Sequence, residues 1–206
     1  MREYLVSKRL RAYNFPTMPP SAEKKENFFS EIIKFSLIAL AIVIPIRVYV
    51  AQPFIVSGAS MEPTFESGEY LIIDQLTYHF EPPQYGDVVI FHYPKDPSKY
   101  FIKRIIGKPG DTILIERGIV FRYNDENPDG VEIDEPYLSD AHRSRDSFRV
   151  TLEENQYFVL GDNRAESSDS RIWGPLPAEL IVGRPLIRLF PPQDAALFPG
   201  KSTAEE

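Results

Sequence analysis

Short runs of apolar, β-branched and aromatic residues recur from residue 53 onward, and residues typical of turns separate them. Runs of about four to eight such residues between turn signals are typical of β-strands. The pairs Gly68-Glu69 and Gly86-Asp87 each read as a turn that enters a strand. No alternation of strand and long helix patterns is present, so we expect antiparallel sheet rather than a doubly wound parallel sheet. The expected strands cover residues 53–56, 69–74, 87–93, 100–106, 111–116, 118–123, 156–161 and 180–190.

The composition changes between residues 118 and 155, where ten acids stand against four arginines and long apolar runs are few. This change predicts a smaller β lobe, at about 118–155, inserted into a main domain of residues 52–190. Residues 191–206 contain little that a core could bury, so we expect a C-terminal surface tail.

A hydrophobic segment occupies residues 28–51, and its last 20 residues would form a helix about 30 Å long, which matches a bilayer core. Its uninterrupted apolar part is only 12 residues long, which alone also fits a buried helix or a signal peptide. Lys34 and Arg47 lie near the ends of the longer window, where their charges reach the membrane interface. A cut after Ala51 would require a small residue where Tyr49 stands. We therefore expect an uncleaved transmembrane anchor.

The net charge of −7 is unevenly distributed along the chain. Residues 1–34 carry seven Lys and Arg against four acids, whereas the rest of the chain carries 16 basic and 26 acidic residues. Positive charge before the anchor predicts a cytoplasmic N-terminus, with residues 1–27 as a flexible tail and residues 52–206 outside. The acidic remainder argues against a nucleic-acid surface, which needs clustered positive charge.

Residues that bind metals or form disulfides are scarce. The sequence has no cysteine, and its three histidines are scattered without the spacing of a zinc site. The acidic cluster at residues 125–130 lacks the spaced ligands and final glutamate of a calcium loop, so we expect a solvated turn. No histidine accompanies a Gly-x-Ser-x-Gly turn, which leaves Ser-His-Asp hydrolysis with little support. We expect no metal and no cofactor.

A serine and a lysine remain as a candidate catalytic pair. A serine hydroxyl is a weak nucleophile until a base takes its proton, and a lysine can be that base only where apolar surroundings lower its pKa. Lys103 follows Phe101 and Ile102 in an expected strand, and Ser60 lies shortly after the hydrophobic segment. Each residue alone has an ordinary alternative, because Lys103 could sit at a sheet edge and Ser60 could be a turn serine before Pro63.

Four sequence blocks, in order, carry a resemblance to the type I signal peptidases. They are PFIVSGASMEPT at 53–64, GDVVIF at 86–91, IKRIIGKPGD at 102–111 and GDNRAESSDSR at 161–171. The resemblance covers roughly residues 30–190. The fold class expected here is mainly β, an antiparallel-sheet catalytic domain with a smaller inserted β lobe, preceded by one N-terminal transmembrane helix.

Carried over by position, the resemblance implies that Ser60 is the acylating nucleophile, Lys103 the general base and Ser167 the group that orients the lysine amine. Some members have an oxyanion-donating serine where this chain has Gly58, so we expect the oxyanion hole to use the Ser60 N–H with the Gly58 region or water. The charged residues expected to brace the site are Arg104, Asp162, Asp169 and Arg171. The residues expected to line shallow apolar pockets for small substrate side chains are Phe54, Val56, Met61, Phe65, Phe101 and Ile102.

These features together predict a membrane-bound serine endopeptidase that cleaves N-terminal signal peptides from exported preproteins through an acyl-enzyme. The expected partners are exported preproteins and the lipid bilayer, with no nucleic acid and no obligate protein partner. The expected location is the bacterial inner (cytoplasmic) membrane, crossed once, with the catalytic domain on the periplasmic or extracellular side. Two alternatives remain open. One is a self-cleaving Ser–Lys regulatory protease, which would need a DNA-binding helix-turn-helix where this chain has the anchor, and the other is a non-catalytic, membrane-tethered β domain that binds peptides.

Overall fold

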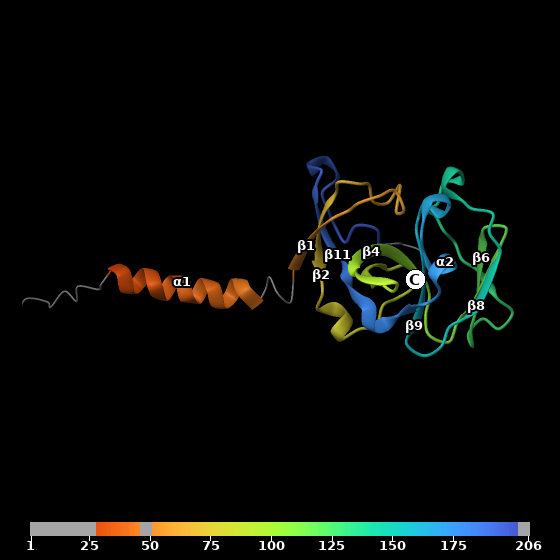
Figure 1. The fold of residues 1–206 in the computed structure, drawn as a ribbon, viewed down its shortest axis with the longest axis horizontal. Coiled ribbons are helices and arrows are strands. Elements are labelled where there is room, and N and C mark those ends of the chain that lie inside the picture. Colours follow the sequence, from red (N-terminus) through yellow and green to blue (C-terminus); the bar gives the residue numbers. More distant parts are fainter. Residues whose placement is uncertain (1–27, 46–50, 202–206) are drawn as a thin grey trace, which may run out of the picture. The chain divides into compact units, whose positions relative to one another are not determined.

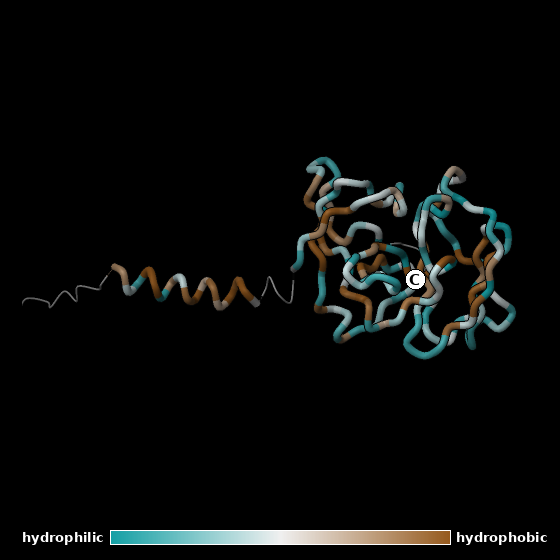
Figure 2. Tube along the Cα trace, in the orientation of Figure 1, coloured by the Kyte–Doolittle hydropathy of each residue, from teal (hydrophilic) through white to brown (hydrophobic). Residues whose placement is uncertain are grey.

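The computed structural model describes residues 28–45 and 51–201, which form one long helix and a β domain (Figure 1). The helix, α1 (Phe28–Pro45), is largely hydrophobic along its length (Figure 2), and most of its large apolar side chains are exposed. Within the described residues, no helix combines the length and the apolar character that crossing a membrane requires. Residues 46–50 of the predicted anchor and the predicted tail of residues 1–27 lie outside the described part of the chain.

The larger sheet of the β domain has eight strands, and all its neighbouring pairs are antiparallel. Its strands are β1 (Ala51–Ile55), β2 (Tyr70–Asp74), β3 (Val88–Tyr93), β4 (Asp96–Gly107), β9 (Gln156–Leu160), β10 (Leu176–Pro177), β11 (Ile181–Phe190) and β12 (Ala196–Leu197). They pair in the order β1-β2-β11-β3-β4-β9-β10, and β12 pairs with β11. The expectation of a mainly β, antiparallel domain is confirmed.

The smaller sheet forms the inserted lobe. Its strands are β5 (Thr112–Glu116), β6 (Ile119–Tyr123), β7 (Val131–Glu132) and β8 (Phe148–Thr151), paired antiparallel in the order β7-β6-β5-β8. The smaller sheet begins at Thr112, whereas the bounds predicted for the inserted lobe were about 118–155. The change in composition marks the turn of the β5–β6 hairpin, where Arg117 and Gly118 both have a positive φ of 52° and 86°, as two-residue hairpin turns favour.

Short helices fill the connections between the strands. They are η2 (Thr77–His79), η3 (Asp140–His142), η4 (Arg164–Glu166), α2 (Ser170–Trp173), η5 (Ala178–Leu180) and η6 (Pro192–Asp194). The fourth sequence block, residues 161–171, directly follows β9 and contains η4 and the first two residues of α2.

The core of the larger sheet lies around β3 and β4. Residues 88–91 of β3 are all buried, which fits a strand that is covered on both faces. β4 is exposed or half-buried up to Ile102 and buried from Lys103 to its end. The lysine and arginine of the third block therefore stand at the point where this strand enters the core.

The segment after β11, which was predicted to be a surface tail, makes defined contacts with the β domain. β12 pairs with β11 through Leu197 and Ala196, and a Cβ built at Gly200 would lie 2.7 Å from the ring of Phe65. Arg104 also donates a hydrogen bond of 2.7 Å to the Gly200 carbonyl oxygen. Apart from Pro199, residues 191–201 are exposed or half-buried, so the segment lies at the surface while these contacts hold it to the domain, and the predicted C-terminal tail stays a prediction. Residues 202–206 lie outside the described part.

Candidate active site

Ser60 and Lys103 lie together although 43 positions separate them in the sequence. Ser60 stands in the turn after β1, and Lys103 is on β4, paired with Val89 of β3. The Lys103 Nζ lies 2.7 Å from the Ser60 Oγ and donates a second hydrogen bond of 2.7 Å to the Ile102 carbonyl oxygen. Only 3% of Lys103 is exposed. The structure thus brings together the two residues that the sequence singled out.

The surroundings of Lys103 favour its neutral form. Burial lowers the pKa of the Lys103 amine to about 8, and the negative charges of Asp169 and Asp162 partly oppose this effect. An amine with a pKa near 8 is neutral in roughly a tenth of molecules at pH 7, against about 0.03% for an ordinary lysine. A neutral amine that donates one N–H to the Ile102 carbonyl keeps its lone pair available for the Ser60 hydroxyl proton.

The fourth sequence block packs directly against the nucleophile. The Asn163 amide donates a hydrogen bond of 3.1 Å to the Ser60 carbonyl oxygen. A Cβ at Gly161 would lie 2.4 Å from the same Ser60 oxygen and 2.2 Å from the Ser167 Oγ, closer than any real contact. Residue 161 must therefore be glycine for the block to approach Ser60 this closely.

Ser167 lies in the site, but its hydroxyl does not bond the lysine. Its Oγ is buried and has no hydrogen-bond partner among the described residues. The Lys103 amine bonds Ser60 and Ile102 instead. The predicted role of Ser167 in orienting the amine stays a prediction.

The backbone around Gly58 bears on the predicted oxyanion hole. Gly58 has a φ of 95°, and its N–H donates a long hydrogen bond of 3.3 Å to the Ser67 Oγ. The Ser60 N–H donates to no group within the described residues, and Ser60 lines the cleft described below. The Ser60 amide is thus a free donor whereas the Gly58 amide is already bonded, and the use of either in an oxyanion hole stays a prediction.

An open cleft of about 280 Å³ lies over the Ser–Lys pair. Four of the six predicted pocket residues line it, together with groups that the prediction did not include. The lining includes Phe54, Val56, Phe101 and Ile102, and also Ser57, Gly58, Ala59, Leu71, Ile90, Tyr100, Glu166 and Ser168. Met61 and Phe65, with 1% and 0% exposure, lie instead in the hydrophobic core with Leu71 and do not line the cleft.

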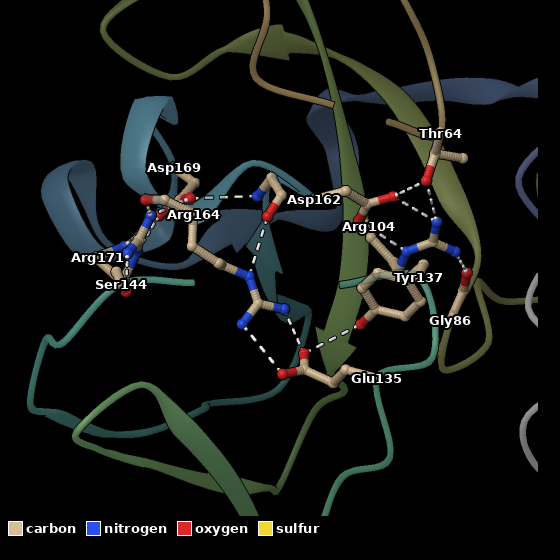
Figure 3. Close-up of polar contacts among 11 residues, drawn as sticks. Thr64, Gly86, Arg104, Glu135, Tyr137, Ser144, Asp162, Arg164, Asp169 and Arg171 are labelled. Carbon is tan, nitrogen blue, oxygen red and sulfur yellow. Dashed lines mark hydrogen bonds and ion pairs between the residues drawn. The ribbon is translucent and has the colours of Figure 1, made fainter. Parts of the chain in front are cut away.

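The charged residues predicted to brace the site form two ion pairs (Figure 3). Arg104 donates two hydrogen bonds, of 2.9 and 2.6 Å, to the Asp162 carboxylate, and both side chains are buried. Arg171 contacts Asp169 through two bonds of 2.8 Å each. The Thr64 hydroxyl adds a bond of 2.5 Å to Asp162. These pairs fix the loop that follows β9.

A third buried ion pair was missed by the sequence analysis. Arg164 of η4 contacts Glu135 of the inserted lobe, and each side chain is only 3% exposed. Tyr137 donates a further bond of 3.0 Å to Glu135. Arg164 belongs to the fourth block, which is a signal that could have marked it. Glu135 is one of ten acids in a polar segment, and nothing in its local sequence indicates a buried partner.

Comparison with known proteins places these observations in a family. The family model described as "Signal peptidase, peptidase S26" matches residues 29–190. A "Probable signal peptidase I-1" from Synechocystis sp. is 38% identical over 171 residues, which are 80% of this chain and 84% of that protein. The "Signal peptidase I" of Bacillus amyloliquefaciens is 34% identical over 190 residues, which are 87% of this chain and 94% of that protein.

A crystal structure of a signal peptidase I from Enterococcus faecalis V583 matches with a TM-score of 0.43 and 28% identity. The matched part is 50% of this chain and 97% of the Enterococcus chain. The residues that the family model matches contain Ser60, Lys103 and the fourth block. This chain belongs to the signal peptidase family, peptidase S26.

Proposed function

We propose that this chain is a membrane-bound serine endopeptidase that removes N-terminal signal peptides from exported preproteins, with Ser60 as the nucleophile and Lys103 as the general base. The observation that carries the proposal is the 2.7 Å contact between the Ser60 Oγ and the Lys103 Nζ in a buried setting that lowers the lysine pKa to about 8. The membership in the signal peptidase family and the names of the relatives support the substrate class.

The proposed reaction has two halves, and in each half Lys103 first accepts a proton and then donates one. As the Ser60 oxygen attacks the scissile carbonyl carbon, the neutral Lys103 amine takes the hydroxyl proton. The resulting ammonium then gives a proton to the leaving amine, and an ester remains on Ser60. In the second half, Lys103 takes a proton from water as the water oxygen attacks the ester carbonyl carbon. The bond between that carbon and the Ser60 oxygen then breaks, Lys103 returns the proton to the Ser60 oxygen, and the carboxylic acid product leaves. The Ser60 N–H donates to the oxyanion of each tetrahedral intermediate, with the Gly58 region or water as the second donor.

The orientation of Lys103 depends on its neighbours. The Ile102 carbonyl holds one N–H of the amine. We assign the buried Ser167 hydroxyl, which is otherwise without a partner, as a second group that holds the amine during the reaction. An amine held on two sides keeps its lone pair directed at the nucleophile.

The cleft suits an extended peptide with small side chains next to the cleaved bond. Its volume of about 280 Å³ is small, and its walls are mainly apolar, with Phe54, Val56, Phe101 and Ile102 among them. Small residues at the first and third positions before the cut are the mark of signal-peptide cleavage sites. The substrate backbone can add to the neighbouring strands, which supplies affinity without demanding particular side chains.

The membrane attachment rests on α1 and on the charge distribution. The exposed apolar side chains of α1 require an apolar environment, and the segment 28–51 continues beyond this helix. The basic residues before it favour a cytoplasmic N-terminus and a catalytic domain outside the cytoplasmic membrane. Protease added outside intact cells or spheroplasts should digest the domain of residues 52–190, and protection of that domain would contradict this orientation.

The test of the proposal uses Ser60→Ala and Lys103→Ala in the full chain, purified in detergent and assayed on a purified preprotein. Both variants should lose at least about a thousandfold in cleavage rate, because the nucleophile or its base is gone. Two matched controls should stay near the wild-type rate: Ser98→Ala and Lys99→Ala, which change an exposed serine and an exposed lysine of the same strand as Lys103.

Near-wild-type cleavage by either active-site variant would refute the Ser–Lys mechanism. A wild-type protein that cuts only itself and never a preprotein would favour the regulatory protease. A wild-type protein that binds signal peptides but forms no covalent adduct at Ser60 would favour the non-catalytic peptide-binding domain.

A further inference from the structure

A buried carboxylate of the inserted lobe, that of Glu135, contacts Arg164 of the segment after β9 (Figure 3). Glu135 follows β7 in the lobe and makes a bidentate contact with Arg164, in which the Nη1 donates to Oε2 at 3.2 Å and the Nη2 donates to Oε1. Arg164 uses its third donor, Nε, on the Gly161 carbonyl oxygen at 2.9 Å. One guanidinium therefore ties the lobe to the segment that packs against Ser60.

This segment, residues 161–163, continues the connection to the nucleophile. The Asn163 amide bonds the Ser60 carbonyl oxygen at 3.1 Å, and Gly161 approaches the same oxygen so closely that a Cβ would lie 2.4 Å away. A shift of the Gly161 carbonyl therefore moves the surface against which Ser60 rests. Every step from Glu135 to Ser60 is a direct contact.

Glu135 is also linked, through Tyr137, to the second arginine of the site. The Tyr137 hydroxyl donates to Glu135 at 3.0 Å, and the Tyr137 ring lies under the Arg104 guanidinium, 4.0 Å from its central carbon. Arg104 in turn holds Asp162 and directly follows Lys103 on β4. The lobe thus contacts the supports of both members of the Ser–Lys pair.

A gain in stability is a weak explanation for this arrangement. The cost of burying two charges cancels most of their attraction, and apolar residues of similar size often stabilise a core as well or better. The charged pair instead fixes geometry, because the planar guanidinium holds both the carboxylate and the carbonyl oxygen that it bonds at defined positions. Arg164 and Glu135 are both buried, so water does not replace either contact.

We propose that Glu135 is a positioning residue for peptide cleavage: it holds Arg164 so that residues 161–163 keep Ser60 at the distance from Lys103 that proton transfer requires. The inserted lobe is then part of the active-site scaffold. This inference rests on the proposed role of the Ser60–Lys103 pair. The expected consequence of losing the carboxylate is slower chemistry with little change in substrate binding, because Glu135 does not line the cleft.

Glu135→Gln tests the inference in the full chain, purified in detergent and assayed with a signal-peptide substrate. The glutamine keeps the shape but presents an N–H₂ group to the arginine donors. Because misplacement of reacting groups by about 1 Å costs on the order of a hundredfold in rate, kcat should fall between about 10- and 100-fold while KM stays within about twofold. Glu132→Gln, an exposed carboxylate of the same lobe, should match the wild type in both constants.

A second variant keeps the test decisive if Glu135→Gln does not fold. Glu135→Asp retains the charge but shortens the side chain by one methylene group, so it should fold and still lower kcat by about tenfold. Circular dichroism and thermal unfolding report the folded fraction, to which the rates are normalised. A folded variant at position 135 with wild-type kcat, or with a raised KM and unchanged kcat, would overturn the inference. Cleavage by Ser60→Ala in the same assay would instead refute the Ser–Lys pair itself.

Discussion

The rate of cleavage should rise with pH through a midpoint near 8, because only the neutral form of Lys103 can accept the Ser60 proton. Burial lowers the pKa of this amine from 10.5 to about 8. The neutral fraction is then about 0.09 at pH 7, 0.5 at pH 8 and 0.9 at pH 9. We therefore expect kcat/KM to rise about tenfold between pH 7 and pH 9 and to level off above that.

An unburied lysine would give a different curve. With a pKa of 10.5 the neutral fraction rises about 100-fold between pH 7 and pH 9 and shows no plateau by pH 9. A histidine base would give a midpoint near 6.5. The position of the plateau, and not the rise alone, distinguishes these cases.

The assay is the initial rate of cleavage of a fluorogenic peptide with an Ala-x-Ala site, measured from pH 6 to pH 10 at constant ionic strength. The peptide contains no histidine, cysteine or free α-amino group, so kcat/KM reports the free enzyme. Any residual cleavage by Lys103→Ala should lack the rise near pH 8, and circular dichroism at each pH controls for unfolding. A midpoint at or below 7, or a rise without a plateau by pH 10, would refute the proposed state of Lys103.

Three further predictions follow from the buried contacts. First, the free energy of unfolding of the wild type relative to Lys103→Met, measured with denaturant, should rise by up to about 3 kcal/mol between pH 7 and pH 10.5. The reason is that the unfolded chain keeps the lysine proton up to pH 10.5, whereas the folded chain loses it near pH 8. An unchanged difference would contradict the lowered pKa. Second, Gly161→Ala should lower kcat by about a hundredfold. The control is Gly183→Ala, whose Cβ would lie 2.2 Å from a carbonyl oxygen of β2, and which should lower stability but keep kcat per folded molecule. Equal kcat values for the two variants would contradict the close packing under Ser60. Deletion of residues 196–206 should lower the free energy of unfolding by at least about 2 kcal/mol, because a buried donor of Arg104 loses the Gly200 carbonyl, and an unchanged unfolding midpoint would contradict the structural role of this segment.

The strands of the larger sheet were predictable from the sequence because their cause is local. Alternating or continuous apolar runs such as 87–93 and 100–106 identify β3 and β4, and turn residues separate them. The hairpin from β5 to β6 shows the limit of this approach. A change in composition located its turn, but the pairing places the preceding strand, from Thr112, in the inserted lobe.

The site was predictable only in part, because its contacts join distant segments. Ser60 and Lys103 could be named from their motifs and from the apolar setting of the lysine. The contact between Arg164 and Glu135 spans 29 positions, and a carboxylate in an acidic, polar segment gives no local sign of burial. Met61 lies close to Ser60 in sequence but packs into the core, because the turn at the nucleophile directs it away from the cleft.

Covalent labelling of Ser60 tests the central claim most directly. The wild-type protein is treated with a serine-directed penem at pH 8, digested and examined by mass spectrometry. We predict a single adduct at Ser60, none in Ser60→Ala, and labelling slowed by at least about a hundredfold in Lys103→Ala. An adduct at another serine, or equally fast labelling without Lys103, would contradict the Ser60–Lys103 mechanism.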